Sequence, residues 1–149
     1  MSTNTDTAVQ PSVTINNDKF LVSDLNDKSK NLLNDLTRTV MEYKELLRSY
    51  NQSLTLTNTY ISGLKTEVEK VGLPESSEEG SPSITIEDKT YEASDLPDSV
   101  KAYVNELVRA NQNKTSIEYR LRQLDAARIT FINALQSEVE ISGIQPAEE

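Results

Sequence analysis

The sequence repeats itself at a fixed offset of 71 residues, and this repeat constrains the possible fold more than any other feature. When residues 11–72 are laid over residues 82–143 without a gap, nearly a third of the positions are identical, and others such as Phe20 and Tyr91 keep their character. Self-similarity of this kind is typical of chains built from duplicated structural units. We interpret the sequence as a tandem duplication of a unit of about 62 residues, a size at which a lone hydrophobic core is marginal.

Both copies begin with a pattern that predicts a small β-hairpin. Residues 13–15 and 84–86 alternate apolar and polar side chains, as a half-exposed strand does. A polar turn follows in each copy, and a second short strand is expected at 20–22 and 90–93.

A Ser-Asp-Leu sequence at 23–25 and 94–96 then predicts the start of a helix, because a Ser or Asp oxygen can accept hydrogen bonds from the first turn. Asp27 and Asp98 suit the positive end of a helix dipole, and Pro97 is tolerated in a first turn. We interpret these recurring acids as caps rather than catalytic carboxylates. The later recurring acids Glu67, Glu69, Glu138 and Glu140 are expected on an exposed helix face.

The rest of each copy shows the three-and-four spacing of apolar residues that predicts a helix with a heptad seam. The regular seam of the first copy comprises Leu33, Leu36, Val40, Tyr43, Leu47, Tyr50, Leu54, Thr57, Ile61, Leu64, Val68 and Val71. In the second copy Asn111, Lys114, Asp125 and Arg128 interrupt the pattern. Such residues either set the register or the choice of partner, at a cost in stability, or face solvent, and both interpretations are open.

The bulky members of the two seams are expected to anchor helix–helix contacts, within the chain or with a partner. The expected interface residues are Tyr43, Leu47, Tyr50, Leu54, Ile61, Ile117, Leu121, Leu124 and Phe131. A long seam in so small a chain leaves more apolar surface than one helix covers, which predicts a homo-oligomer.

Two arrangements fit the helical regions. Neither Gly nor Pro occurs between residues 26 and 62 or between 98 and 142, which permits one long helix in each copy. Such helices would pack antiparallel, within the chain or against a second copy. Alternatively, each region folds back as a helical hairpin near 48–53 and 111–116. We favour long antiparallel helices, because the two breaks are not equivalent under the 71-residue offset.

The composition excludes several classes of chemistry. The chain has no Cys and no His, which excludes thiol nucleophiles, Cys/His zinc sites and histidine acid–base catalysis. Its four glycines are scattered rather than gathered in a phosphate-binding loop. The linker acids Glu75, Glu78 and Glu79 lack the spacing of a calcium loop. We therefore expect no enzyme activity, no cofactor and no metal.

The charge and hydropathy of the chain restrict its partners. With 15 basic and 24 acidic residues, the net charge is −9, which disfavours binding to nucleic acids and to anionic membrane surfaces. No apolar stretch approaches the length of a membrane-spanning helix, and the first ten residues lack the features of a signal peptide. The expected partner is therefore another protein or a second copy of the chain.

One concentration of basic residues supports an alternative function, that of an accessory factor associated with nucleic acid. Arg109, Lys114, Arg120, Arg122 and Arg128 lie along the second helical region. Amphipathic helices more often carry such charges as a solvent-exposed face or as ion pairs with acidic residues.

The order of strand, turn, aromatic residue, Ser-Asp-Leu and heptad helix resembles a group of small uncharacterised proteins of tailed phages that infect marine cyanobacteria. The closing aromatic-x-x-x-Leu stretch reads Tyr60–Leu64 in one copy and Phe131–Leu135 in the other. The resemblance covers nearly all of each copy, although the usual members carry the unit once. It implies a virion-associated or accessory phage protein, located in the virion or the host cytoplasm, and it brings no catalytic residues.

These observations predict an α+β, predominantly helical chain. Repeats at 11–73 and 84–144, each a short β-hairpin followed by a heptad-patterned helix or helical hairpin, are joined by an acidic Pro/Ser/Gly linker at 74–83. A disordered start (1–10) and a short tail (145–149) flank them. The expected function is that of a non-enzymatic structural or protein-interaction protein that binds itself, or a virion or host protein, through its helical seams.

Overall fold

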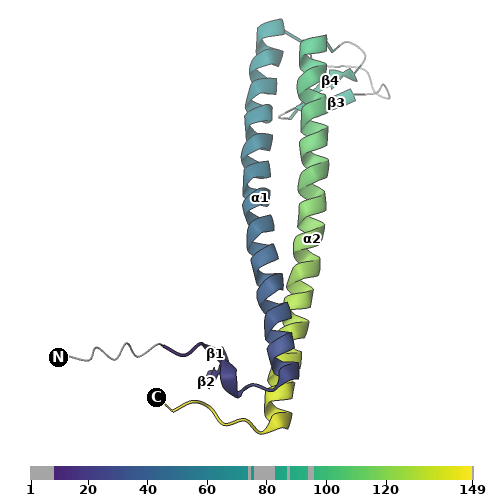
Figure 1. Cartoon of the computed structure of the whole chain (residues 1–149). Coiled ribbons are helices and arrows are strands. Elements are labelled where there is room, and N and C mark those ends of the chain that lie inside the picture. The colour runs from purple at the N-terminus through teal and green to yellow at the C-terminus, as the bar shows by residue number, and fades with distance from the viewer. Residues whose placement is uncertain (1–8, 74, 76–82, 87, 94–95, 149) are drawn as a thin grey trace, which may run out of the picture. The chain divides into compact units, whose positions relative to one another are not determined.

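The computed structural model of the chain contains two long helices and two small β-hairpins (Figure 1). The predicted α+β, mostly helical class is confirmed. The structure describes residues 9–73, 75, 83–86, 88–93 and 96–148. Most of the expected disordered start, most of the linker and the serine and aspartate of the second Ser-Asp-Leu sequence lie outside the described residues.

The first hairpin joins β1 (Ser12–Ile15) to β2 (Asp18–Leu21) in antiparallel pairing. Asn16 and Asn17 form its two-residue turn with φ angles of 52° and 69°. Two-residue hairpin turns need such positive φ angles to match the twist of the strands, and asparagine tolerates them better than most residues. The polar turn of the sequence therefore fixes the register of this hairpin.

The second hairpin joins β3 (Ser83–Ile86) to β4 (Lys89–Glu92), also in antiparallel pairing. The turn residue Asp88 has a positive φ of 66°. Each strand begins and ends 71 residues after its counterpart in the first hairpin.

Each helical region is one uninterrupted helix of 45 residues, α1 (Asp27–Val71) and α2 (Asp98–Ser142). The alternative in which each region folds back as a helical hairpin is wrong. Gly72 and Gly143 follow the two helices with φ angles of 66° and 67°, the left-handed conformation that ends many helices. The weak helix formers near the middle do not break either helix, because packing of one face supplies most of the stability of a helix in a protein.

Helix α1 begins after the position that the Ser-Asp-Leu sequence predicts. Val22–Asp24 form a 3-10 turn, and Asn26 is the N-cap. Its Oδ1 accepts a hydrogen bond of 2.8 Å from the backbone N–H of Ser29. The predicted capping by the Ser-Asp pair is therefore wrong, because the 3-10 turn separates that pair from the first helical residue and leaves Asn26, a favoured cap, beside it.

The chain forms two compact units, and each unit contains one hairpin and segments of both helices. The first unit comprises residues 1–44 and 122–149, and the second comprises residues 45–121. In both units the helical segments run antiparallel, because the first turns of one helix share a core with the last turns of the other. The repeats at 11–73 and 84–144 cross the boundaries of these units and stay a prediction.

The core of the first unit joins its hairpin to both helices. Ile15 and Phe20 of the hairpin and Leu25 pack with Leu135 and Val139 of α2, and leucines from the first turns of α1 lie against them. The tail after α2 covers the hairpin too, since the backbone N–H of Ala147 donates a hydrogen bond of 2.7 Å to the carbonyl oxygen of Lys19.

The core of the second unit uses corresponding positions. Tyr91, Leu96 and Val100 pack with Leu64 and Val68 of α1. Four of these five residues lie 71 positions from a core residue of the first unit, and Val100 lies 71 positions after Ser29.

Ser29 and Val100 are both fully buried, with an exposed fraction of 0%. The Oγ of Ser29 has no hydrogen-bond partner among the described residues, and a buried hydroxyl without a partner costs free energy on folding. The first unit therefore buries an unpaired hydroxyl group at the position where the second unit buries an apolar side chain.

We expect Ser29→Ala to raise the free energy of unfolding by about 1–2 kcal/mol, because it removes the unpaired hydroxyl and improves helix propensity. Far-UV circular dichroism during urea unfolding measures the change. The control is Ser62→Ala at an exposed position of α1, which gains about 0.5 kcal/mol from helix propensity alone. An equal rise in the free energy of unfolding in both variants would contradict the view that the buried hydroxyl of Ser29 destabilises the fold.

The two helices of the second unit approach closely at Gly63. A Cβ atom built there would lie 2.6 Å from Cε1 of Tyr103, far inside normal contact. The positions 71 residues from this pair hold Leu32 and Ala134, so the second unit combines a smaller residue, glycine, with a larger one, tyrosine. Tyr103 occupies the space that a side chain at Gly63 would need.

We expect Gly63→Ala to lower the free energy of unfolding by about 1 kcal/mol or more, because overpacking outweighs the gain in helix propensity. In a Tyr103→Leu background the same change should become stabilising, by up to about 1 kcal/mol. A double-mutant cycle in urea measures this coupling. The same effect in both backgrounds would show that Tyr103 does not determine the residue at position 63.

Candidate functional site

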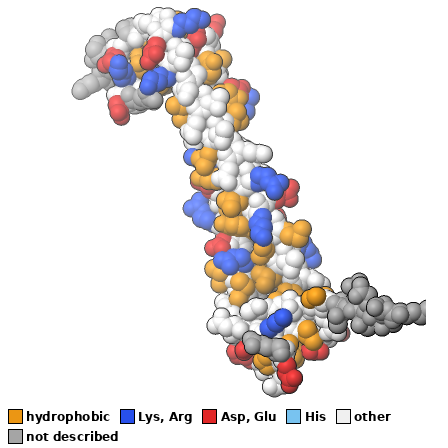
Figure 2. All heavy atoms as spheres, turned by 90° about the vertical axis from the view of Figure 1, so that its left-hand side faces the viewer, with side chains coloured by type: hydrophobic (Ala, Val, Ile, Leu, Met, Phe, Trp, Pro, Cys, Tyr) orange, Lys and Arg blue, Asp and Glu red, His pale blue; other side chains and the backbone are white. Residues whose placement is uncertain are grey.

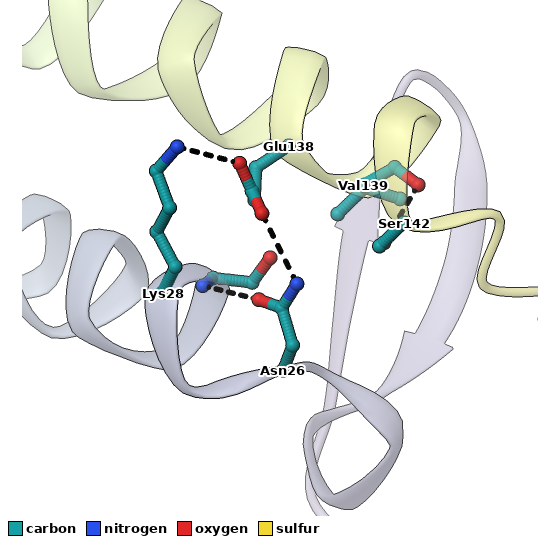
Figure 3. A network of polar contacts seen from close by, with 6 residues as sticks. Asn26, Lys28, Glu138, Val139 and Ser142 are labelled. Atoms are coloured by element: carbon teal, nitrogen blue, oxygen red, sulfur yellow. Dashed lines mark hydrogen bonds and ion pairs between the residues drawn. The ribbon is translucent and has the colours of Figure 1, made fainter.

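In the first unit, Asn26, Lys28 and Glu138 form a group of polar contacts where α1 begins and α2 ends (Figure 3). We call these three residues the polar clasp. Glu138 Oε2 lies 2.8 Å from Lys28 Nζ, and Glu138 Oε1 accepts a hydrogen bond of 3.1 Å from Asn26 Nδ2. Asn26 therefore caps α1 with its oxygen and holds α2 with its nitrogen. The expectation that Glu138 lies on an exposed face is wrong, since its side chain is only 13% exposed.

The clasp favours the ionised form of Glu138. The ion pair with Lys28 and the hydrogen bond from Asn26 hold the pKa of this carboxyl below its ordinary value. The counterparts of Asn26 and Lys28 in the second copy are Pro97 and Ser99, which offer neither an amide nor an ammonium group. The two units therefore differ in their electrostatics although their apolar cores correspond.

We expect Glu138→Gln to lower the urea midpoint near neutral pH, and the difference from the unsubstituted chain to shrink as the pH falls below about 4. The pKa of Glu138 is lower in the folded chain than in the unfolded chain. Its carboxylate therefore stabilises the fold above the ordinary pKa, and this contribution is lost as the pH falls through the folded value. The control is Glu140→Gln at an exposed position. A gap that stays constant between neutral and acidic pH would contradict an ionic clasp.

A second polar contact joins the helices of the second unit. The hydroxyl of Tyr50 donates a hydrogen bond of 3.0 Å to Oε1 of Glu118. This bond, together with burial and the nearby charge, raises the pKa of Tyr50, because the hydrogen bond is lost when the phenol ionises. Tyr50 thus contacts α2 within its own unit. The sequence alone does not decide whether its contact lies within the chain or with a partner.

The expected interface residues fall into three classes of burial. Leu124 is buried with an exposed fraction of 4%, whereas Leu47 and Ile61 are exposed by 40% and 37%. The remaining six are half-buried: Tyr43, Tyr50, Leu54, Ile117, Leu121 and Phe131.

The buried face of α1 differs from the predicted seam at alternate positions. The half-buried Leu46 and Tyr60 take the places expected of the exposed Leu47 and Ile61. Ser53 is buried more deeply than its neighbour Leu54, which is half-buried. Neighbouring residues on a helix are about 100° apart, so either set can flank a face centred on Tyr50, Thr57 and Leu64. The packing against α2 selects the set that contains the small Ser53, and sequence spacing alone does not reveal that choice.

The predicted basic face consists largely of paired or half-buried residues. Arg109 lies 3.1 Å from Glu106, and Arg128 lies 2.8 Å from Asp125, each pair three residues apart. Lys114 and Arg128 are half-buried, and Arg109, Arg120 and Arg122 are exposed. Arg109, Lys114 and Arg120 belong to the second unit, and Arg122 and Arg128 to the first. Ion pairing within a helix accounts for two of these five positions without a nucleic acid.

The interruptions of the second seam do not all face solvent. Lys114, Asp125 and Arg128 are half-buried, whereas Asn111 is exposed. The solvent-facing interpretation therefore holds for Asn111, and the other three lie at the border of the packed face.

A shallow hollow of about 420 Å³ in the first unit has two acids, Asp18 and Glu140, in its lining. Another of about 330 Å³ lies in the second unit and is lined by Leu56, Tyr60, Glu106, Arg109, Ala110 and Asn113. The acids expected as caps, Asp24, Asp27 and Asp98, are exposed, and Asp95 lies outside the described residues. Among the described residues no cluster of three or more acids could hold a metal ion.

The linker acids are described only at Glu75, which lies 3.4 Å from Lys89 on β4. Glu78 and Glu79 lie outside the described residues. The one linker carboxylate that can be placed therefore pairs with a cation of the second hairpin.

Comparison with known proteins identifies no relative. No protein-family model, no curated protein and no solved structure matches the chain. No helix in the described part of the chain is long and apolar enough to cross a membrane. Any assignment of function therefore depends on the surfaces and contacts of the molecule itself.

Proposed function

We propose that the chain is a non-enzymatic protein-interaction protein that binds protein through exposed apolar side chains of α1 and α2. The observation that carries this proposal is the set of large hydrophobic side chains left between 37% and 77% exposed on the helices, among other apolar and charged side chains at the surface (Figure 2). These residues are Met41, Leu47, Leu56, Ile61, Val71, Val108, Tyr119, Ile129 and Ile141.

The energetics of apolar surface support this proposal. Each Å² of apolar surface removed from water is worth about 25 cal/mol. In both units the hairpin and the helices already cover the central seam, so the described part of each core offers no further segment for the exposed side chains to pack against. Six of the nine exposed residues belong to the second unit, which makes it the richer source of contact surface.

A non-enzymatic role is supported by the uses of the carboxylates. Glu138 and Glu118 each bond a residue of the other helix, and both bonds have a structural explanation. The recurring acids that the structure describes at the start of the helices, Asp24, Asp27 and Asp98, are exposed, whereas a catalytic carboxyl needs burial or a charged partner to tune its pKa.

The proposal includes an origin by tandem duplication and helix packing of the coiled-coil type. The duplication is supported by the constant offset of 71 residues between the bounds of corresponding strands and helices. Coiled-coil packing is supported by the recurrence of buried and half-buried residues three and four apart, from Val100 to Val139 on α2.

A phage virion or host cytoplasm is the proposed location, supported by the resemblance of each copy to small proteins of tailed phages that infect cyanobacteria. Mass spectrometry of purified particles from the source of the sequence tests the virion location. Recovery at a fixed number of copies per particle is expected of a virion component, whereas recovery only from infected cells indicates an accessory factor.

We expect a photo-crosslinking amino acid at Tyr119, which is 62% exposed, to form protein adducts of discrete mass in cells that naturally make the chain. The control position is Ser116, an exposed polar residue one turn earlier on α2. Gel mobility with protease or nuclease treatment identifies the adducts. Adducts with nucleic acid only, or equal adducts at both positions, would contradict binding of protein through apolar side chains.

A further inference from the structure

Helix α1 carries a long uncharged segment in the second unit. No Asp, Glu, Lys or Arg occurs from Ser49 to Leu64, although 26% of the chain is charged. Charged residues resume at Arg48 on one side and at Lys65 on the other. Exposed helix surfaces normally carry charged residues, so this segment differs from the rest of the surface.

Five side chains form one stripe along this segment and the turn that precedes it. Leu47, Asn51, Leu54, Asn58 and Ile61 are spaced by four, three, four and three residues, which places them on one side of the helix. All of them are exposed except Leu54, which is half-buried. We call these five residues the uncharged stripe. It lies beside the face that packs against α2.

The threonines around the stripe require little solvation of their hydroxyls. The hydroxyl groups of Thr55 and Thr59 donate hydrogen bonds of 3.1 and 2.9 Å to the backbone carbonyls of Asn51 and Thr55, four residues earlier. A threonine bonded in this way has satisfied its donor within the helix and can turn its methyl group outward. The cost of removing water from this surface is therefore lower than the count of polar residues indicates.

We propose that the uncharged stripe binds a second copy of this chain in a two-fold dimer, with the two α1 helices antiparallel and crossing at Leu54. The inference rests on the proposed function and names its partner. In a two-fold contact the same surface faces itself, so every charge close to the axis meets a charge of the same sign. Two copies of a chain with a net charge of −9 repel each other. This repulsion is smallest when they meet through side chains that carry no charge.

The order of side chains in the stripe fits an antiparallel contact. Reversing the stripe places Leu47 against the partner's Ile61, Leu54 against the partner's Leu54, and Asn51 against the partner's Asn58. Apolar groups then meet apolar groups and amides meet amides. In a parallel two-fold contact each residue faces the same residue of the partner, whatever the sequence is. The symmetric order of apolar and amide residues in the stripe therefore matters only for an antiparallel contact. Antiparallel helix dipoles also favour it.

The two asparagines suit a contact between identical chains. An amide is both donor and acceptor, so it can pair with the same group of a second copy, which neither an ammonium nor a carboxylate can do. Asparagine within an apolar seam also fixes register at some cost in stability. Lys44 and Lys65 border the stripe and are exposed, so water and salt screen their charges. A partner of a different sequence would instead be expected to match the charges of an acidic chain.

Sedimentation equilibrium of the full chain tests the dimer. We expect a reversible dimer with a dissociation constant on the order of micromolar, because the contact is short, and association that persists or strengthens in added salt, which screens the net charge. Replacing both Leu47 and Ile61 with Glu should weaken association about tenfold or more. The matched control is Leu56→Glu, which is 47% exposed on the same helix but off the stripe and should leave the dimer unchanged.

Disulfide trapping tests the orientation, and the absence of native cysteine makes it specific. When Asn51→Cys and Asn58→Cys chains are mixed and oxidised, we expect disulfides mainly between the two variants. Disulfides mainly between identical variants indicate a parallel contact and overturn the inference. A monomeric chain, or equal loss of the dimer in the Leu56→Glu control, overturns it as well. A monomer that still forms adducts with another protein at Tyr119 leaves the proposed function standing, so the two failures are distinguishable.

Discussion

A hairpin of two four-residue strands cannot bury a core by itself, and the organisation of this chain follows from that constraint. Each hairpin covers its apolar face with the first turns of the helix that follows it and the last turns of the other helix. The helices must therefore run antiparallel in each unit, and each core draws on both helices. Ile15 and Phe20 depend on Leu135 and Val139 in the same way that Tyr91 depends on Leu64 and Val68.

The sequence predicts the elements of this fold well, because each is encoded by local chemistry. Alternation at 13–15 and the polar Asn16–Asn17 turn specify the first hairpin, and the apolar spacing specifies two helices. The start of α1 lies later than the sequence predicts because Ser23, Asp24 and Asn26 all offer caps, and only the 3-10 turn decides in favour of Asn26. An asparagine directly before Asp27 was the available signal, since asparagine is a preferred cap.

The candidate surface could be predicted only in part, because periodicity identifies a face but not what the opposite helix places against it. Leu124 and Tyr50 lie at the packed face as their spacing indicates, whereas Leu47 and Ile61 remain exposed. Burial of Ser53 and the close approach of Gly63 to Tyr103 depend on the distance between two helices. The pairing of Lys28 with Glu138 joins residues far apart in the sequence, and no local pattern encodes it.

The composition of the two units has a consequence for the order in which the chain can fold as it is synthesised. The second unit is one continuous stretch, residues 45–121, so its core can close while the rest of the chain is still being made. The first hairpin leaves the ribosome before the second unit does, yet its core requires Leu135 and Val139, which follow the second unit in the sequence. Contacts so distant in sequence form late and slowly. The first hairpin must therefore wait with Phe20 uncovered until Leu135 and Val139 have been made, and during that interval its apolar face is exposed to aggregation and to chaperones.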